Sequence, residues 1–114
     1  MNGKVIAIDF DGTIVDRAKY PKIGNLKPNV VESIQKLQNA GYICFLWTCR
    51  QGKELVNAIK FLEKNGINLW GYNQSPYDFT IGSNRKVVAD IYIDDCDVFC
   101  DEINWNKIVE RLVK

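Results

Sequence analysis

The hydrophobic residues of this chain fall into two kinds of segment that alternate along it. Three nearly continuous apolar runs, "KVIAIDF" (4–10), "YICFLWT" (42–48) and "DIYIDD" (90–95), have the pattern of strands in a parallel sheet, buried on both faces. A shorter run, "INLWGYN" (67–73), predicts one more short strand. The chain therefore contains the strands of a small sheet.

Between these runs, apolar residues recur every three or four positions, which indicates amphipathic helices. One helix is expected to begin near Pro28 and to stop at Gly41, and a second to run from about 53 to 65 and end at Gly66. A third helix is expected over "NWNKIVERLVK" (104–114). Strands alternating with helices predict an α/β fold with a doubly wound, Rossmann-like parallel sheet.

The composition is that of an ordinary globular domain. The chain has 114 residues, 46% of them hydrophobic and 25% charged, so we expect a single domain over 1–114. Its net charge of +1 favours neither a nucleic-acid nor a membrane partner. No apolar run reaches the ~20 residues that span a bilayer, and no signal peptide is evident, so a cytoplasmic protein is expected.

The cysteines do not have the spacing of a zinc site, because the chain lacks both histidine and a CxxC pair. Cys44 lies inside an apolar run and is expected to be a small buried hydrophobe. "CDVFC" (96–100) could hold a metal or a disulfide, but structural or free thiols are favoured.

Carboxylates gather where the expected strands end. Asp9 and Asp11 follow the first strand, and Asp94 and Asp95 follow the last. The ends of parallel strands share one edge of a sheet, so the four should converge, and Asp9 and Asp11 should point to the same side unless a turn has begun. Four carboxylates together repel one another, and a hard divalent cation relieves that repulsion. Oxygen ligands alone favour Mg²⁺ over zinc.

Other polar residues are expected at the same edge. Gly12 and Thr13 complete "DFDGT", the segment Thr48-Cys49-Arg50 follows the second strand, and Lys86 precedes the last. Each has an ordinary structural explanation when taken singly, such as a turn, a helix cap, a strand end or a surface lysine. Their order on a strand–helix scaffold makes the set a candidate site.

The set formed by "DFDGT", Thr48 in "FLWTCR", Lys86 and "YIDD" resembles the phosphatase branch of the haloacid dehalogenase superfamily. The resemblance covers residues 4 to about 102. It implies that Asp9 is the nucleophile and Asp11 the general acid/base. It also implies that Thr48 and Lys86 hold the phosphate. With an aspartate at position 11, the motif resembles that of the phosphatases and phosphomutases of the superfamily. Its dehalogenases lack an acid at this position, and its ion-pumping ATPases have threonine there.

The resemblance also implies a metal site and a mechanism. The ligands of Mg²⁺ would be the Asp9 carboxylate, the Asp11 backbone carbonyl and an acid of the Asp94/Asp95 pair, with Asp95 the better match. Asp9 would form an aspartyl phosphate, which water then hydrolyses. Backbone N–H groups near Gly12 and Thr13, with Cys49 and Arg50, are further candidates for holding phosphate oxygens.

The spacing leaves no room for the cap domain that many members of this superfamily carry. Only a short flap (residues 14–27) separates the first motif from the first helix. An open site suits extended phosphomonoesters, including nucleotides and nucleic-acid 3′-phosphate ends. Basic residues could form a rim for a polyanion, or could simply be solvated; they are Arg17, Lys19, Lys22, Lys27, Arg50 and Lys53.

Two other classes of function are compatible with the same residues. Receiver domains of signalling systems also combine acids, a threonine and a lysine around Mg²⁺, although there the acid pair comes first along the chain. A non-catalytic phosphate-binding module is the other alternative. The leading "DxDGT" favours a phosphatase.

Overall fold

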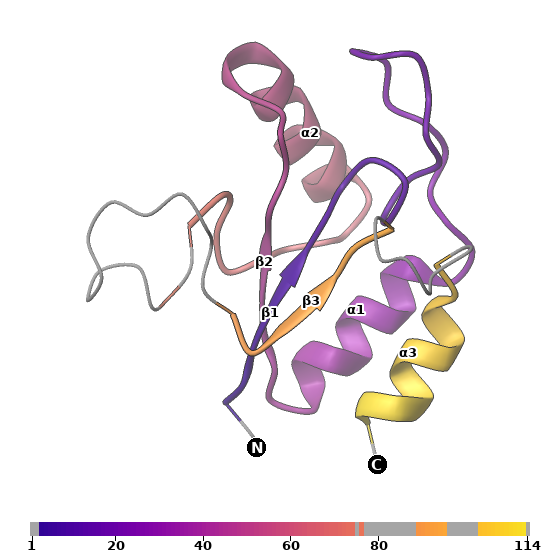
Figure 1. The fold of residues 1–114 in the computed structure, drawn as a ribbon, viewed down its shortest axis with the longest axis vertical. Helices are drawn as coiled ribbons and strands as arrows, with labels where there is room; N and C mark the ends of the chain where they lie inside the picture. The colour runs from indigo at the N-terminus through magenta and orange to yellow at the C-terminus, as the bar shows by residue number, and fades with distance from the viewer. Residues whose placement is uncertain (1–2, 75, 77–88, 96–102, 114) are drawn as a thin grey trace.

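The computed structural model describes residues 3–74, 76, 89–95 and 103–113, which form a small α/β domain (Figure 1). Along the chain the elements are β1 (Val5–Ile8), α1 (Val30–Asn39), β2 (Ile43–Leu46), α2 (Gly52–Lys64), β3 (Ile91–Ile93) and α3 (Trp105–Leu112). The three strands form one parallel sheet in the order β2-β1-β3. The predicted parallel α/β architecture is confirmed.

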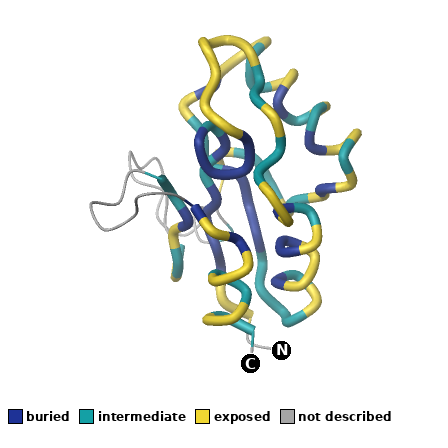
Figure 2. Tube along the Cα trace, turned by 90° about the vertical axis from the view of Figure 1, so that its right-hand side faces the viewer, coloured by how far each residue is buried: buried dark blue, intermediate teal, exposed yellow. Residues whose placement is uncertain are grey.

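The described helices all pack against one face of the sheet. Ile6 and Ile8 of β1, aligned with Cys44 and Leu46 of β2, share one hydrophobic cluster with apolar residues of α1, α2 and α3. The other face presents Val5, Ala7 and Phe45, which are also buried. In Figure 2 the central strand β1 is buried throughout and β2 over most of its length, β3 is only partly buried, and the helices alternate between buried and exposed positions. Among the described residues no helix packs on the second face, so the doubly wound arrangement stays a prediction.

The segment 67–73 is not a strand, contrary to expectation. It lies beside β2 and makes one isolated parallel bridge, Tyr72 with Leu46. The Trp70 N–H donates to Cys44, and the Leu46 N–H donates to Gly71. The segment leaves the extended conformation at Asn73, whose φ of 53° is left-handed, so the ladder stops after one bridge.

The helices were predicted closely, apart from their ends. The helix expected near Pro28 begins at Val30, because Asn29 has a left-handed φ of 63° and cannot belong to it. The third helix is shorter than expected, and the Asn104 side chain caps it by accepting a hydrogen bond from the Lys107 N–H. No helix within the described ranges has both the length and the apolar character needed to cross a membrane.

Burial decides the role of the cysteine in β2. Cys44 is buried, and burial raises the pKa of its thiol to about 12, so the predicted small hydrophobe is confirmed. Cys49, in contrast, is a free and exposed thiol after β2. Cys96 and Cys100 lie outside the described residues.

Candidate functional site

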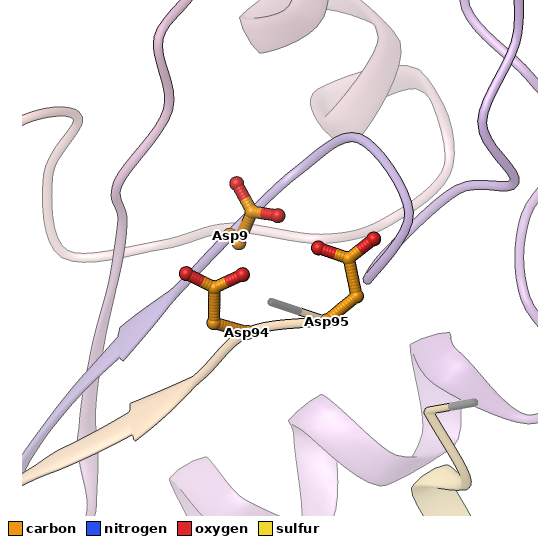
Figure 3. A group of neighbouring side chains, drawn as sticks. All are labelled: Asp9, Asp94 and Asp95. Atoms are coloured by element: carbon orange, nitrogen blue, oxygen red, sulfur yellow. The ribbon is translucent and has the colours of Figure 1, made fainter. Parts of the chain in front are cut away.

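Three carboxylates meet where β1 and β3 end. Asp9 follows β1, and its N–H donates to the Ile93 carbonyl of β3 at 3.0 Å, so the two strand ends are held together. One carboxylate oxygen each from Asp9, Asp94 and Asp95 lies within 4.8 Å of the others. Figure 3 shows the three side chains gathered beyond the strand ends. The convergence expected from the sequence is present for these three acids.

The environment of Asp9 opposes its ionisation. Burial, followed by the neighbouring charges of Asp94 and Asp95, raises the pKa of Asp9 to about 7, against the lowering effect of two hydrogen bonds. One of these comes from the Phe10 N–H and the other from the Thr13 hydroxyl, 3.2 Å from Asp9 Oδ2. A cation among the three acids would favour the ionised carboxylate.

The donor set fits a magnesium ion. Oxygens that bind one Mg²⁺ at ~2.1 Å are at most roughly 4.2 Å apart, so a small closure of the three side chains would suffice. All three donors are hard carboxylate oxygens, which suit Mg²⁺ better than zinc. The Asp11 carboxylate is not in this group, and its backbone carbonyl stays a predicted ligand.

The loop after β1 is a compact buried turn. The Phe10 carbonyl accepts hydrogen bonds from the N–H groups of Thr13, Ile14 and Val15, and the Gly12 N–H donates to the Val15 carbonyl at 2.8 Å. The N–H groups of Gly12 and Thr13, which we expected to hold phosphate, are therefore engaged inside the turn. A phosphate role for them stays a prediction that requires these bonds to open.

Gly12 makes room for one of the acids. Its φ is +86°, and a Cβ built at this position would overlap the Asp95 carboxylate and approach Arg17. Glycine is thus needed here both for the backbone conformation and for the close approach of Asp95.

Asp11 points to a different partner from Asp9, because the turn has begun before it. Its Oδ2 accepts from Arg50 Nε and its Oδ1 from Arg50 NH2, both at 2.8 Å. The sequence predicted that Asp9 and Asp11 face the same side unless a turn has begun, and the structure shows this exception. Asp11 nonetheless lines the same pocket as Asp9.

Arg50 is buried rather than part of a solvated rim. Its side chain is 1% exposed, and it also donates to the carbonyls of Pro21 (3.0 Å) and Lys22 (2.9 Å) in the flap. The hydrogen bonds that Arg50 donates to Asp11 raise the pKa of Arg50 above its ordinary value. The sequence predicted a substrate contact here, whereas the guanidinium is bonded to the protein itself.

Thr48 lies in the same pocket and is fixed by two neighbours. Its hydroxyl accepts from the Arg50 N–H at 3.2 Å, and its N–H donates to Asn73 Oδ1 at 2.7 Å. Asn73 was not identified from the sequence as a site residue. Its only signal there was its place at the end of the expected strand over 67–73.

Arg17 is a second residue whose role the sequence did not indicate beyond a basic rim. Its guanidinium pairs with Asp95 through Nε–Oδ2 (2.9 Å) and NH2–Oδ1 (3.1 Å), while the side chain stays 63% exposed. The pairing ties the flap to the acidic cluster from the solvent side.

A pocket of about 390 Å³ lies against these groups. Its lining comes from the ends of the strands and from the flap: Asp9, Asp11, Arg17, Ala18, Tyr20, Trp47, Thr48, Cys49, Arg50 and Asp94. Lys86, the predicted phosphate-binding lysine, lies outside the described residues, as do Asp97 and Asp101. Six of the predicted site residues therefore line this pocket together with the aromatic residues Tyr20 and Trp47.

The fold and site define a parallel α/β protein with an acidic cluster at the carboxyl edge of its sheet. The chain is similar to a solved structure described as the conserved protein coded by a locus from Bacteroides thetaiotaomicron, with 37% identity and a TM-score of 0.85. The match covers 96% of this chain and 88% of that one. The chain belongs to the same family as that conserved protein. No protein-family model and no curated protein matches it.

Proposed function

We propose that this protein is a Mg²⁺-dependent phosphatase of the haloacid dehalogenase type, which hydrolyses a phosphomonoester through an aspartyl phosphate. The observation that carries the proposal is the group formed by Asp9, Asp94 and Asp95 beside a pocket that Asp11 and Thr48 also line. Asp9 comes first in "DFDGT", as a nucleophile of that type would.

Asp9, Asp94 and Asp95 would hold the metal. Bound there, Mg²⁺ would reduce the repulsion between a carboxylate nucleophile and a phosphate dianion. The high pKa of Asp9 in the metal-free protein supports this assignment, since three crowded acids are costly without a cation.

The chain's own residues carry the chemistry. An Asp9 oxygen attacks phosphorus, the bond to the leaving oxygen breaks, and Asp11 gives that oxygen a proton. Water then attacks the phosphorus of the aspartyl phosphate, Asp11 takes a proton from it, and phosphate leaves Asp9. The Thr13 hydroxyl, 3.2 Å from Asp9, keeps the nucleophile oriented.

The residues that line the pocket support a substrate class. It is bordered by the rings of Tyr20 and Trp47, and Tyr20 is 60% exposed. Aromatic rings beside a phosphate site suit a nucleotide or a nucleic-acid 3′-phosphate end, whose bases stack on them. We therefore place extended, base-carrying phosphomonoesters ahead of small sugar phosphates.

The second candidate is a regulatory module that accepts or binds phosphate without turning over. The observation that favours it is the bidentate bond between Arg50 and Asp11, which occupies both oxygens of the proposed general acid/base. A site in which Asp11 did not activate water would keep a phosphorylated Asp9.

Hydrolysis of p-nitrophenyl phosphate tests the proposal. We expect turnover with Mg²⁺, none with chelator, and none in Asp9→Asn; Lys60→Ala, an exposed change on α2, is the matched control. Activity that survives rigorous metal removal would contradict the proposal. A stable phosphate adduct on Asp9 without turnover would favour the regulatory module.

A panel of substrates tests the substrate class. The values of kcat/KM should be higher for a 3′-phosphorylated oligonucleotide and a nucleoside monophosphate than for a hexose phosphate. A preference for the hexose phosphate would overturn the assignment.

A further inference from the structure

The geometry points to Arg50 as a positioning residue that fastens the flap (residues 14–27) over the pocket and at the same time fixes the direction of the Asp11 carboxylate. The part that concerns Asp11 rests on the proposed function. The part that concerns the flap does not.

The bonding of Arg50 supports this role. Four of its five N–H groups are used: two by Asp11 and one each by the carbonyls of Pro21 and Lys22. The rings of Phe10 and Tyr20 each lie 5.2 Å from its Cζ. A guanidinium so surrounded would have to give up some of these bonds before it could bind a substrate phosphate through two N–H groups.

The flap depends on Arg50 at its tip, whereas its base is held by its own backbone. At the base the Asp16 N–H donates to the Asn25 carbonyl (2.7 Å) and the Lys27 N–H to Ile14 (2.8 Å). Nearer the tip, the carbonyls of Pro21 and Lys22 both accept from Arg50. Loss of the guanidinium should therefore release the tip and leave the base in place.

The same side chain links the flap to the catalytic groups. Tyr20, next to Pro21, lines the pocket, and so do Arg17 and Ala18. The backbone N–H of Arg50 also donates to the hydroxyl of Thr48, a bond that does not involve the guanidinium. The guanidinium thus sets the position of the pocket wall and the orientation of Asp11.

A planar guanidinium is required for this arrangement. Lysine would keep the positive charge, but it lacks the fork that binds both oxygens of Asp11 and the two carbonyls together. Arg50→Lys is therefore an informative variant, and it retains a counter-charge for Asp11 where Arg50→Ala leaves none.

The flap is tested first, by a readout that needs no activity. We expect trypsin to cleave after Lys19 and Lys22 at least about tenfold faster in Arg50→Lys and Arg50→Ala than in the wild type, because cleavage follows the open population. Lys60→Ala should cleave as the wild type does. The amides of Asp16 and Lys27 should stay protected from hydrogen exchange in Arg50→Lys, which shows that the domain is folded. Unchanged cleavage in Arg50→Lys would overturn the proposal.

The positioning of Asp11 is tested by the leaving group. An alkyl phosphate needs a proton from Asp11, whereas p-nitrophenyl phosphate needs little help in that step. Arg50→Lys should lower kcat for the alkyl substrate by roughly 10²-fold, with a clearly smaller loss for p-nitrophenyl phosphate and a nearly unchanged KM. Added guanidinium ion should restore part of kcat in Arg50→Ala. A rise in KM of equal size for both substrates would show instead that Arg50 binds phosphate, and would overturn the inference.

The two proposals can fail separately. A wild-type protein that hydrolyses no phosphate ester, with a flap that opens in Arg50→Lys, would contradict the proposed function and support the flap attachment. An active protein whose flap and leaving-group dependence are unaffected by Arg50→Lys would contradict this inference alone.

Discussion

Asp9 and Asp11 are two positions apart, yet their surroundings differ in every respect that matters for chemistry. Asp9 faces two other carboxylates and has a pKa raised to about 7 by burial and by their charge. Asp11 faces a buried guanidinium that bonds to both its oxygens. The proposed roles, nucleophile with metal and proton carrier, require such a difference between two like groups.

The two aspartates should accordingly fail in different ways when changed to asparagine. Asp9→Asn should give no phosphoenzyme and no turnover with any leaving group. Asp11→Asn should release about one p-nitrophenolate per enzyme in a burst and then turn over ~10²–10⁴-fold more slowly, because water lacks its base. Rapid-mixing kinetics measure the burst, and mass spectrometry locates the adduct. Identical behaviour of the two variants, or an adduct on another residue, would show that the roles are misassigned.

The sequence predicted which residues lie at the site better than it predicted the contacts that these residues make with one another. Strand-end positions follow from periodicity, so the convergence of Asp9 with Asp94 and Asp95 was foreseeable. The Asp11–Arg50 bond was not, because it depends on where the turn begins. Asn73 was missed for a similar reason: its contact with Thr48 depends on a left-handed backbone angle.

At the scale of elements, the loop between β1 and the flap determines the geometry of the acids. Its glycine has a left-handed φ and lies against Asp95 and Arg17. Gly66, at the end of α2, has a similar φ of +80° but open space around its Cα. Comparing alanine substitutions at Gly12 and Gly66 therefore separates the cost of the left-handed backbone from the effect of a methyl group that overlaps Asp95.

Gly12→Ala should weaken Mg²⁺ binding by at least about tenfold, because the methyl group of the alanine displaces the Asp95 carboxylate. A tenfold loss of affinity corresponds to a ligand contact worth ~1.4 kcal/mol. Both Gly12→Ala and Gly66→Ala should lose about 1–2 kcal/mol of unfolding free energy from the left-handed conformation. Titration with Mg²⁺ monitored by calorimetry distinguishes them. Equal metal affinity in the two variants would contradict the role assigned to Gly12.

The loop is also fastened to α3. Trp105 is 1% exposed, and its Nε1–H donates to the Thr13 carbonyl at 2.9 Å. Sequence periodicity predicted an amphipathic helix here but not the partner of the Trp105 indole, which lies 92 positions away along the chain. Hydrogen bonds between distant segments leave no periodic signal.

Trp105→Phe should lower the unfolding free energy by about 2 kcal/mol, because the buried Thr13 carbonyl loses its donor and the smaller ring leaves a gap. Trp70→Phe, at a position 52% exposed, should change it by less than ~0.5 kcal/mol. Urea denaturation followed by circular dichroism gives both values. Similar losses in the two variants would mean that the Thr13 contact contributes little.

For the whole molecule, the protonation of Asp9 links the unfolding free energy to pH and to the binding of the proposed Mg²⁺. Asp9 has a pKa of about 7 when folded, against an ordinary value of 3.8. Between these two values the folded protein holds a proton that the unfolded chain has lost. The unfolding free energy of the metal-free protein therefore falls as pH rises through this window, and the loss is complete above pH 7. On the proposed function Mg²⁺ would act in the opposite direction, because it would bind the ionised carboxylate and would have to displace that proton.

Thermal unfolding on either side of pH 7, with chelator and with Mg²⁺, should show both effects. In chelator, Asp9→Asn should be more stable than the wild type above pH 7, since it removes a charge from a crowded acidic group, and this advantage should shrink as pH falls toward 4. Mg²⁺ should raise the Tm of the wild type more above pH 7 than below it, and should raise that of Asp9→Asn little at either. The difference in Tm between the wild type and Asp9→Asn separates the contribution of Asp9 from that of the other titrating groups. A wild type stabilised equally by Mg²⁺ at both pH values would show that the ion binds elsewhere, and the acidic edge would then need another explanation.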